Sequence, residues 1–176
     1  MSIEQKLKDA IRDVPDFPKP GIIFKDITPI MMNAELSSEL LDHMVETFKD
    51  QGIDAIAGIE SRGFLFGYPL AMRLGVPFVM IRKKGKLPYK KIDVSYDLEY
   101  GQATIEMHTD AVDDGMKVLI HDDLLATGGS AQAAAKLIEK AGGKVVGFNF
   151  LVSLEFLQGA GKLKEYSDNI TNFASY

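Results

Sequence analysis

The sequence contains no cysteine. This absence excludes disulfide scaffolds, thiolate zinc sites, iron–sulfur clusters and cysteine nucleophiles together. Histidine is scarce, with 3 residues in 176, so few soft metal ligands remain. Long apolar runs are also absent: the longest stretch without a charged residue, 124–135, has 12 residues and includes two glycines. Because a transmembrane helix needs roughly 18 or more apolar residues, we expect no membrane-spanning segment.

The size and composition are those of an ordinary soluble domain. A chain of 176 residues with 46% hydrophobic and 26% charged residues is expected to form one compact core, so we predict a single domain over 1–176. The first six residues lack the apolar core of a signal peptide, and the sequon at Asn169 is therefore not expected to be glycosylated. These features favour a cytoplasmic protein.

The charge balance is acidic, with one local exception. A net charge of −5 and a pI of about 5.2 disfavour a general nucleic-acid-binding surface, which needs many cations on phosphates. Residues 82–91, however, carry six of the 20 cations and no acid. Such a run is often only a solvated surface. With Gly85 and the Leu87-Pro88 pair inside it, we interpret this segment as a mobile loop that binds a small polyanion.

Helix-like and strand-like segments alternate along the chain. Helical spacing of apolar residues predicts helices over 3–14, 36–48, 70–74 and 131–141, with Pro69 in the first turn of the third. Apolar runs predict strands at 55–59, 78–81, 103–107, 118–120 and 145–152. Repeated βα units predict an α/β fold with a mainly parallel twisted sheet and helices on both faces. Ligands bind at the carboxyl ends of the strands in such sheets.

The most informative string follows the predicted strand 118–120. Asp122 and Asp123 come next, followed by a loop with Gly128 and Gly129 and then a helix N-terminus. Glycines allow close backbone approach, so successive N–H groups can surround one phosphate. Paired carboxylates beside that loop need another partner, either a metal ion or a vicinal diol. A ribose 5-phosphate satisfies both halves, although a polar strand end followed by a capped turn is the alternative for the Asp pair alone.

Two other nucleotide-binding motifs are excluded. No Gly-x-x-x-x-Gly-Lys-Ser/Thr string is present, because Gly142-Gly143-Lys144 continues with Val145 and lacks the first glycine. The segment from Gly159 has Lys164 where a dinucleotide-binding fold requires its third glycine.

The string over 118–130 resembles the phosphoribosyl-pyrophosphate signature of the type I phosphoribosyltransferases. Its core, DDLLATGG at 122–129, is similar to the form found in the adenine-specific members of that family. Ser130 stands where threonine is commoner but keeps the hydroxyl. His121 stands where an aliphatic residue is usual, and its role is left open.

Further blocks resemble the same family in the same order, so the resemblance covers about 17–154. Residues 17–29 resemble an N-terminal hood, which we place mainly at 15–33, and 58–67 resemble a pyrophosphate loop. Residues 82–88 and 96–101 resemble a flexible loop, about 83–98, and the start of the next strand. The resemblance implies a type I phosphoribosyltransferase fold: a central sheet flanked by helices, with a small N-terminal hood.

The resemblance also implies a set of site residues. Those expected to bind the ribose and its 5-phosphate are Asp122, Asp123, Ala126, Thr127, Gly128, Gly129 and Ser130. Those expected to bind pyrophosphate are Ser61, Arg62, Arg82 and Lys86, and those expected around adenine are Ile23, Phe24, Lys25 and Leu154. Glu99 and Arg62 are the expected catalytic residues, Glu99 by handling a proton on the purine ring. Without the resemblance, Glu99 would be interpreted as an exposed loop acid and Ser61-Arg62 as a helix cap.

The implied activity belongs to purine salvage. The 5-phosphoribosyl group of 5-phosphoribosyl 1-pyrophosphate passes to adenine, giving AMP and pyrophosphate, with Mg²⁺ held mainly through the substrate and no direct protein ligand. The resemblance also implies a homodimer. Hypoxanthine or guanine, xanthine and orotate remain alternative acceptors. A module that only senses 5-phosphoribosyl 1-pyrophosphate is less favoured. Such a regulator needs a basic DNA-binding domain, whereas the first residues are expected to form only one short helix without a basic surface.

Overall fold

The computed structural model describes residues 1–98 and 101–176, so Glu99 and Tyr100 lie outside the described residues. The chain divides into two compact units, 1–47 and 48–176, and each is described by itself. A single domain over 1–176 stays a prediction.

The N-terminal unit combines short helices with a hairpin. Helix α1 (Ile3–Ala10) begins where predicted, with the Ser2 hydroxyl accepting a hydrogen bond from the Gln5 N–H at 3.2 Å. It ends four residues earlier than expected, because the next residues form β1 (Arg12–Pro15), which pairs antiparallel with β2 (Ile23–Asp26). Helices α2 (Thr28–Met31) and α3 (Ala34–Phe48) follow. The segment expected as a hood, 15–33, therefore holds β2 and α2.

The C-terminal unit is built on a seven-stranded sheet with the order β5-β6-β4-β3-β7-β8-β9. The five strands β4, β3, β7, β8 and β9 run parallel to one another, whereas β6 is antiparallel to both β4 and β5. The prediction of a mainly parallel sheet is therefore confirmed. The strands are β3 (Ala55–Ile59), β4 (Phe78–Lys83), β5 (Lys91–Asp97), β6 (Gln102–His108), β7 (Lys117–Leu125), β8 (Lys144–Ser153) and β9 (Ile170–Ser175).

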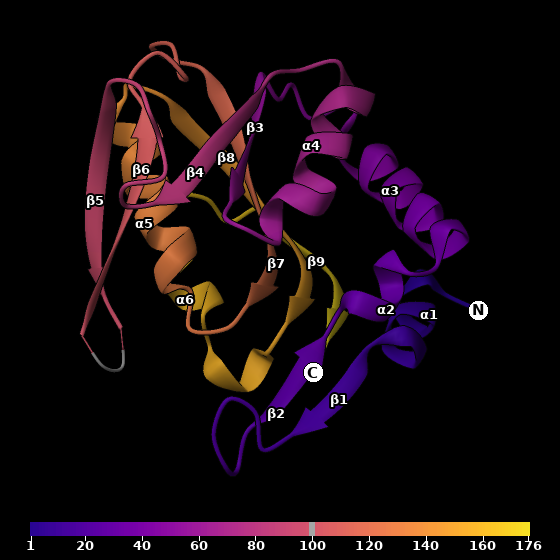
Figure 1. Cartoon of the computed structure of the whole chain (residues 1–176). Coiled ribbons are helices and arrows are strands. Elements are labelled where there is room, and N and C mark those ends of the chain that lie inside the picture. Colours follow the sequence, from indigo (N-terminus) through magenta and orange to yellow (C-terminus); the bar gives the residue numbers. More distant parts are fainter. Residues whose placement is uncertain (99–100) are drawn as a thin grey trace. The chain divides into compact units, whose positions relative to one another are not determined.

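Two crossover helices cover opposite faces of this sheet (Figure 1). Helix α4 (Gly63–Leu74) joins β3 to β4, and α5 (Gly129–Lys140) joins β7 to β8. The two connections leave the sheet centre in opposite directions, and right-handed crossovers then require opposite faces. The strand order thus reverses between β3 and β7, which is where α/β sheets open a crevice for ligands. A 3₁₀ turn (Glu155–Leu157) and α6 (Ala160–Leu163) follow β8.

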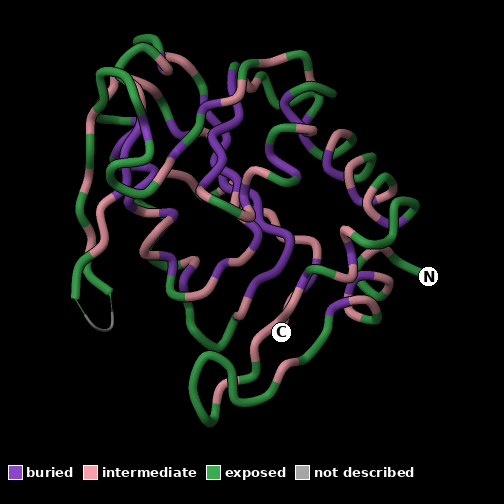
Figure 2. Tube along the Cα trace, viewed as in Figure 1, coloured by how far each residue is buried: buried purple, intermediate pink, exposed green. Residues whose placement is uncertain are grey.

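Alternating strand residues build a core on each face. Ala55 and Ala57 of β3 belong to the core that includes the alanine-rich face of α5. Gly58, one residue on, faces the other way, because a Cβ there would meet Phe78 and the Gly63 carbonyl at the start of α4. Figure 2 shows the buried residues concentrated along the central strands.

Helix α4 corrects one expectation. Pro69 was predicted in the first turn, but it lies inside the helix, which begins six residues earlier, at Gly63. The buried residues Gly63, Phe66, Gly67, Leu70 and Ala71 share one helical face. Packing of that face outweighs the one backbone hydrogen bond that proline removes.

The segment expected as a flexible loop, 83–98, differs from the expectation as well. Its second half forms β5, which pairs with β6 over seven residues. The side chains of Ile92, Val94 and Tyr96 alternate on the face packed against the core that contains α5. The irregular part is confined to about 84–90.

Candidate active site

The loop after β7 forms a cradle at the start of α5. Gly128 has φ +79° and caps α5 without a side-chain hydrogen bond. The first N–H groups of a helix lack intrahelical partners and carry partial positive charge, so they favour an anion. The loop packs tightly, because a Cβ on Gly128 would lie 2.6 Å from the Gly159 carbonyl oxygen. Only glycine satisfies both the dihedral angle and this approach.

Asp122 and Asp123 lie inside β7, which extends past the predicted strand 118–120 to Leu125, and their carboxylates have different contacts. The Asp123 carboxylate is buried and contacts Arg62, with Oδ2 2.9 Å from the guanidinium Nε. Asp122 Oδ1 accepts a hydrogen bond from the Asp123 N–H at 2.9 Å. Burial and the Asp123 charge raise the pKa of Asp122 well above its ordinary value of 3.8, and the Arg62 guanidinium opposes them.

Two hollows meet at Asp122. The larger, about 440 Å³, opens at the ends of β3 and β7. It is lined by Ile59, Glu60, Ser61, Arg62, Lys83, Tyr96, Ile105, Asp122, Asp123, Leu124 and Ser130. The smaller, about 80 Å³, is enclosed by the glycine loop from Leu124 to Ala131, together with Asp122 and Phe150. Since Asp122 and Ser130 line both, a sugar with its phosphate in the smaller hollow would extend its ring hydroxyls past Asp122 into the larger one.

The expected pyrophosphate residues divide into two groups. Ser61 and Arg62 line the larger hollow at the start of α4, after a cis peptide bond between Glu60 and Ser61. Arg82 and Lys86 belong to the cationic segment, residues 82–91, but they do not line the larger hollow. Lys83 is the residue of this segment that lines it.

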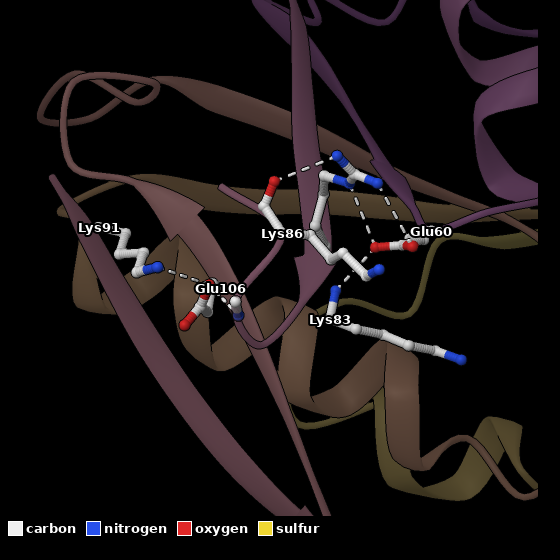
Figure 3. A network of polar contacts seen from close by, with 7 residues as sticks. Glu60, Lys83, Lys86, Lys91 and Glu106 are labelled. Carbon is white, nitrogen blue, oxygen red and sulfur yellow. Dashed lines mark hydrogen bonds and ion pairs between the residues drawn. The ribbon is translucent and has the colours of Figure 1, made fainter. Parts of the chain in front are cut away.

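Two carboxylates hold the cationic segment, as Figure 3 shows. Glu60 contacts Arg82, with Oε2 3.2 Å from Nε, and accepts the Lys83 N–H at 2.9 Å. Glu106 accepts the Gly85 N–H at 3.0 Å and contacts Lys91 Nζ at 3.2 Å. Burial works to raise the pKa of Glu60, but the Lys83 N–H and Arg82 outweigh it and hold that pKa below 4.5. Each carboxylate therefore binds one backbone N–H and one cation of the segment.

Several of these residues were not identified from the sequence. Glu60 is the first residue after β3, the position where the strand-end rule already places ligands, so that signal was available. Tyr96 gave no local signal. Its hydroxyl lies 3.0 Å from Ser130 Oγ, a contact that links β5 to the cradle across 34 residues.

His121 is a buried polar residue inside the sheet. It is fully buried, and its Nδ1 lies 2.7 Å from Asn149 Oδ1 on β8. Burial lowers the pKa of His121 to about 4, so the ring is neutral at pH 7. A Cβ on Gly67 of α4 would lie 3.2 Å from the ring, which places His121 beneath α4 and away from the two hollows.

The expected adenine residues lie in separate units. Ile23, Phe24 and Lys25 form the first part of β2 in the N-terminal unit, where Phe24 packs edge-on against Phe17 at 5.2 Å between ring centroids. Leu154 follows β8 in the C-terminal unit and donates its N–H to the Leu125 carbonyl. Their joint contact with adenine therefore stays a prediction, as does the role of Glu99, which lies outside the described residues.

Over residues 1–98 and 101–176, no helix is long and apolar enough to cross a bilayer. Within the same residues, no three histidine, aspartate or glutamate side chains are grouped closely enough to form a metal site.

Comparison with known proteins identifies the family. Residues 25–173 match the family described as phosphoribosyl transferase domain. The adenine phosphoribosyltransferase of Cytophaga hutchinsonii is 50% identical over 174 residues, covering 99% of this chain and 96% of that protein. The crystal structure of the Thermoanaerobacter pseudethanolicus adenine phosphoribosyltransferase matches with a TM-score of 0.93 and 47% identity, covering 98% of this chain and 99% of that one.

A second solved structure carries ligands. The Saccharomyces cerevisiae adenine phosphoribosyltransferase, complexed with an imino-altritol bisphosphate and adenine, has a TM-score of 0.90 and 42% identity, covering 97% of this chain and 98% of that one. The family match and these identities extend over nearly the whole sequence. The chain therefore belongs to the adenine phosphoribosyltransferases of the phosphoribosyltransferase family.

Proposed function

We propose that the chain transfers the 5-phosphoribosyl group of 5-phosphoribosyl 1-pyrophosphate to adenine, releasing AMP and pyrophosphate. The observation that carries this is the junction of the two hollows at Asp122, with a glycine cradle on one side and Arg62 on the other. Relatives of about 50% identity over nearly their whole length are named for adenine, which favours it over the other acceptor bases and over a regulatory module.

The glycine cradle and the carboxylates of Asp122 and Asp123 are proposed to bind different parts of the phosphorylated sugar. The N–H groups at the start of α5, with the hydroxyls of Thr127 and Ser130, bind the 5-phosphate. Asp122 and Asp123 accept hydrogen bonds from the ribose hydroxyls. These bonds strengthen as positive charge develops on the ribose ring, because an ionised carboxylate stabilises the positively charged transition state more than it stabilises the neutral ground state.

The leaving pyrophosphate requires positive charge. Arg62 lines the larger hollow and is 41% exposed there, so its guanidinium is held by Asp123 but remains accessible to an anion. Lys83, Arg82 and Lys86 supply further charge from the cationic segment. The carboxylates of Asp122 and Asp123 already contact the Asp123 N–H and Arg62, respectively. This fits a magnesium ion that is bound through substrate oxygens and water instead of directly by these carboxylates. When bound, the ion neutralises charge on the leaving group.

Adenine selectivity is proposed to come from the N-terminal unit and the end of β8. The resemblance to the family implies that Ile23, Phe24, Lys25 (through its backbone) and Leu154 contact adenine. Backbone N–H and C=O groups reject a base with the wrong exocyclic group, since such a base leaves buried polar groups unpaired. Glu99 would handle the proton on the ring nitrogen.

The homodimer and the cytoplasmic location belong to the same proposal. The dimer rests on the resemblance to the family. The location rests on the substrate, because a sugar carrying a phosphate and a pyrophosphate is too highly charged to cross a bilayer unaided and must be used where it is made.

The decisive experiment is an assay of product formation with adenine, hypoxanthine, guanine, xanthine and orotate, each with 5-phosphoribosyl 1-pyrophosphate and magnesium. We expect AMP from adenine and about 10⁴-fold or more lower kcat/KM with the other bases, the discrimination typical of a site built to hydrogen-bond one substrate group. Comparable turnover of hypoxanthine or guanine would contradict the assignment.

A further inference from the structure

The carboxylate of Glu60 occupies an unexpected position for a site that binds anions. It lines the larger hollow beside Ser61 and Arg62, and its side chain is only 14% exposed. An unpaired carboxylate there would repel pyrophosphate. Instead, Glu60 is paired with Arg82 through both oxygens, at 3.2 Å to Nε and 3.5 Å to Nη2.

Arg82 uses its remaining side to fold the cationic segment. Its Nη1 donates to the Lys86 carbonyl at 3.2 Å, across the turn in which the Lys86 N–H donates to the Lys83 carbonyl. Glu60 also accepts the Lys83 N–H at 2.9 Å. The Glu60–Arg82 pair therefore connects the end of β3 to both ends of the turn 83–86, Glu60 through the Lys83 N–H and Arg82 through the Lys86 carbonyl. Figure 3 labels Glu60, Lys83 and Lys86. The like charges of this segment repel one another. The contacts of Glu60 and Arg82 hold the segment in one conformation despite that repulsion.

We propose that Glu60 is a positioning residue, which through its pair with Arg82 holds the cationic segment against the pyrophosphate side of the site. This inference rests on the proposed function, because it takes pyrophosphate as the ligand of the larger hollow. Glu60 acts through Arg82 and does not itself bind the anion.

Whether Glu60 favours or opposes pyrophosphate binding depends on whether Arg82 is present. While the pair exists, the charge of Glu60 is largely cancelled, so its main effect is to order the segment and favour pyrophosphate. When Arg82 is removed, Glu60 becomes an unpaired negative charge at the wall of the hollow and opposes pyrophosphate. One substitution at Glu60 is therefore expected to have opposite effects in the two backgrounds.

Glu60→Gln isolates this effect. The amide keeps an acceptor for the Lys83 N–H but sets an NH₂ group against the Arg82 guanidinium, so it removes the ion pair and little else. The experiment measures pyrophosphate binding by calorimetry, with magnesium in the buffer, for the wild type, Glu60→Gln, Arg82→Ala and the double variant. Glu139→Gln, an exposed residue in the last turn of α5, removes the same charge far from the site and serves as the matched control.

We expect Glu60→Gln to weaken pyrophosphate binding by about tenfold or more in the wild-type background, the scale of losing a charge-assisted contact. In the Arg82→Ala background it should strengthen binding by about threefold, and Glu139→Gln should have no effect in either. Equal weakening in both backgrounds, with a lowered melting temperature, would show a merely structural role and overturn the inference. Strengthening in both would show a competing carboxylate and overturn it too. If the wild type bound no pyrophosphate, the proposed function itself would fail.

Discussion

Asp122 carries a conflict between stability and activity. Its pKa in the folded protein lies well above 3.8, chiefly because of burial and then Asp123, so the native state favours the protonated form. A raised carboxyl pKa adds stability that is complete below pH 3.8 and lost as the pH rises through the folded pKa. At pH 7 Asp122 therefore makes the fold less stable than a neutral side chain would, while the proposed mechanism needs its charge.

Asp122→Asn should separate the two effects. The amide oxygen still accepts the Asp123 N–H, so we expect the melting temperature at pH 7 to rise by about 2–4 °C, the change that about 1 kcal/mol produces in a chain of this size. Near pH 3.5 the difference should vanish. Turnover should fall by about 10- to 100-fold, as expected for losing a charge-assisted contact. Thermal denaturation at both pH values and kcat measurements test this, and an unchanged kcat would contradict the role of Asp122.

Glu99 is expected to act on the proton of the purine ring. Glu99→Gln keeps the shape of the side chain but cannot exchange a proton, so kcat should fall by about 10²- to 10⁴-fold, the usual range for general acid–base assistance. The KM for adenine should change much less. Steady-state kinetics with adenine varied checks this, with Glu99→Leu as a second variant. If Glu99→Leu turned over adenine as fast as the wild type, the role would be withdrawn.

His121 predicts a pH dependence of stability that is independent of catalysis. Its pKa falls from 6.5 to about 4 on folding, chiefly because of burial. Below pH 6.5 the unfolded chain takes up a proton that the native state refuses, so stability is lost as the pH falls towards 4, by up to about 3 kcal/mol at 1.36 kcal/mol per pKa unit.

The double variant His121→Leu with Asn149→Leu removes both members of the buried pair and leaves neither side chain unpaired. Urea denaturation of the wild type and the double variant at pH 7, 5.5 and 4.5 should show a smaller loss of unfolding free energy in the variant. Identical pH slopes would show that His121 is not titrating in this way.

At the scale of the element, the cradle depends on one backbone conformation. Gly128→Ala places a Cβ at φ +79° and 2.6 Å from the Gly159 carbonyl oxygen, so the loop must shift. We expect the KM for 5-phosphoribosyl 1-pyrophosphate to rise about tenfold or more, together with a lowered melting temperature. Gly115→Ala is the matched control, because Gly115 has φ +74° with nothing within 4 Å of its Cβ. That variant should show the left-handed strain of about 1–2 kcal/mol alone, with an unchanged KM. Equal KM values in both variants would argue against the cradle.

Elements with strong local signals could be predicted from the sequence, and elements defined by distant partners could not. Strand β3 and helix α5 carry their own apolar patterns and were located within two residues. Strand β9 has only three apolar residues among six, without strict alternation, and becomes a strand because β8 offers it a backbone partner. Likewise, β5 is defined by pairing with β6 and packing against the core of α5. Helix α4 begins early because its buried face has β3 to pack against, which overrides Pro69.

The same distinction applies to the site. The string from Asp122 to Ser130 is contiguous, so its chemistry could be predicted from residue types and spacing alone. The Glu60–Arg82 pair joins residues 22 apart, and the Tyr96–Ser130 contact joins residues 34 apart. No local pattern specifies such contacts, because they arise only when β3, β4 and β5 take their places in the sheet.

At the scale of the whole molecule, the site follows from the strand order. The crossovers through α4 and α5 leave β3 and β7 in opposite directions, so two helix N-termini meet at the carboxyl ends of these adjacent strands. One end receives Arg62 and the other the glycine cradle. A substrate with a phosphate at one end and a pyrophosphate at the other matches this pair of positive ends.

The proposed homodimer leads to a prediction about Arg82. The resemblance to the family implies that Arg82 contributes to the site of the partner subunit, and its side chain remains 28% exposed beside Glu60. A two-fold dimer makes any such contact twice. In a mixed dimer of one Asp122→Asn chain and one Arg82→Ala chain, the Arg82→Ala chain keeps its own Asp122 and receives arginine from the other chain. One of the two sites then has both groups, although its own Glu60 is unpaired.

The experiment unfolds equal amounts of the two variants, each nearly inactive alone, and refolds them together. Sedimentation should give about 39 kDa, twice the chain mass of 19.4 kDa. Random pairing makes half of the dimers mixed, so up to about a quarter of the wild-type activity should return, whereas each variant refolded alone regains only its own low activity. If Arg82 served only its own chain, every site in the mixture would carry one lesion. Activity no greater than the sum of the two parents, with chain exchange verified by mass spectrometry of differently tagged chains, would therefore reject the shared site.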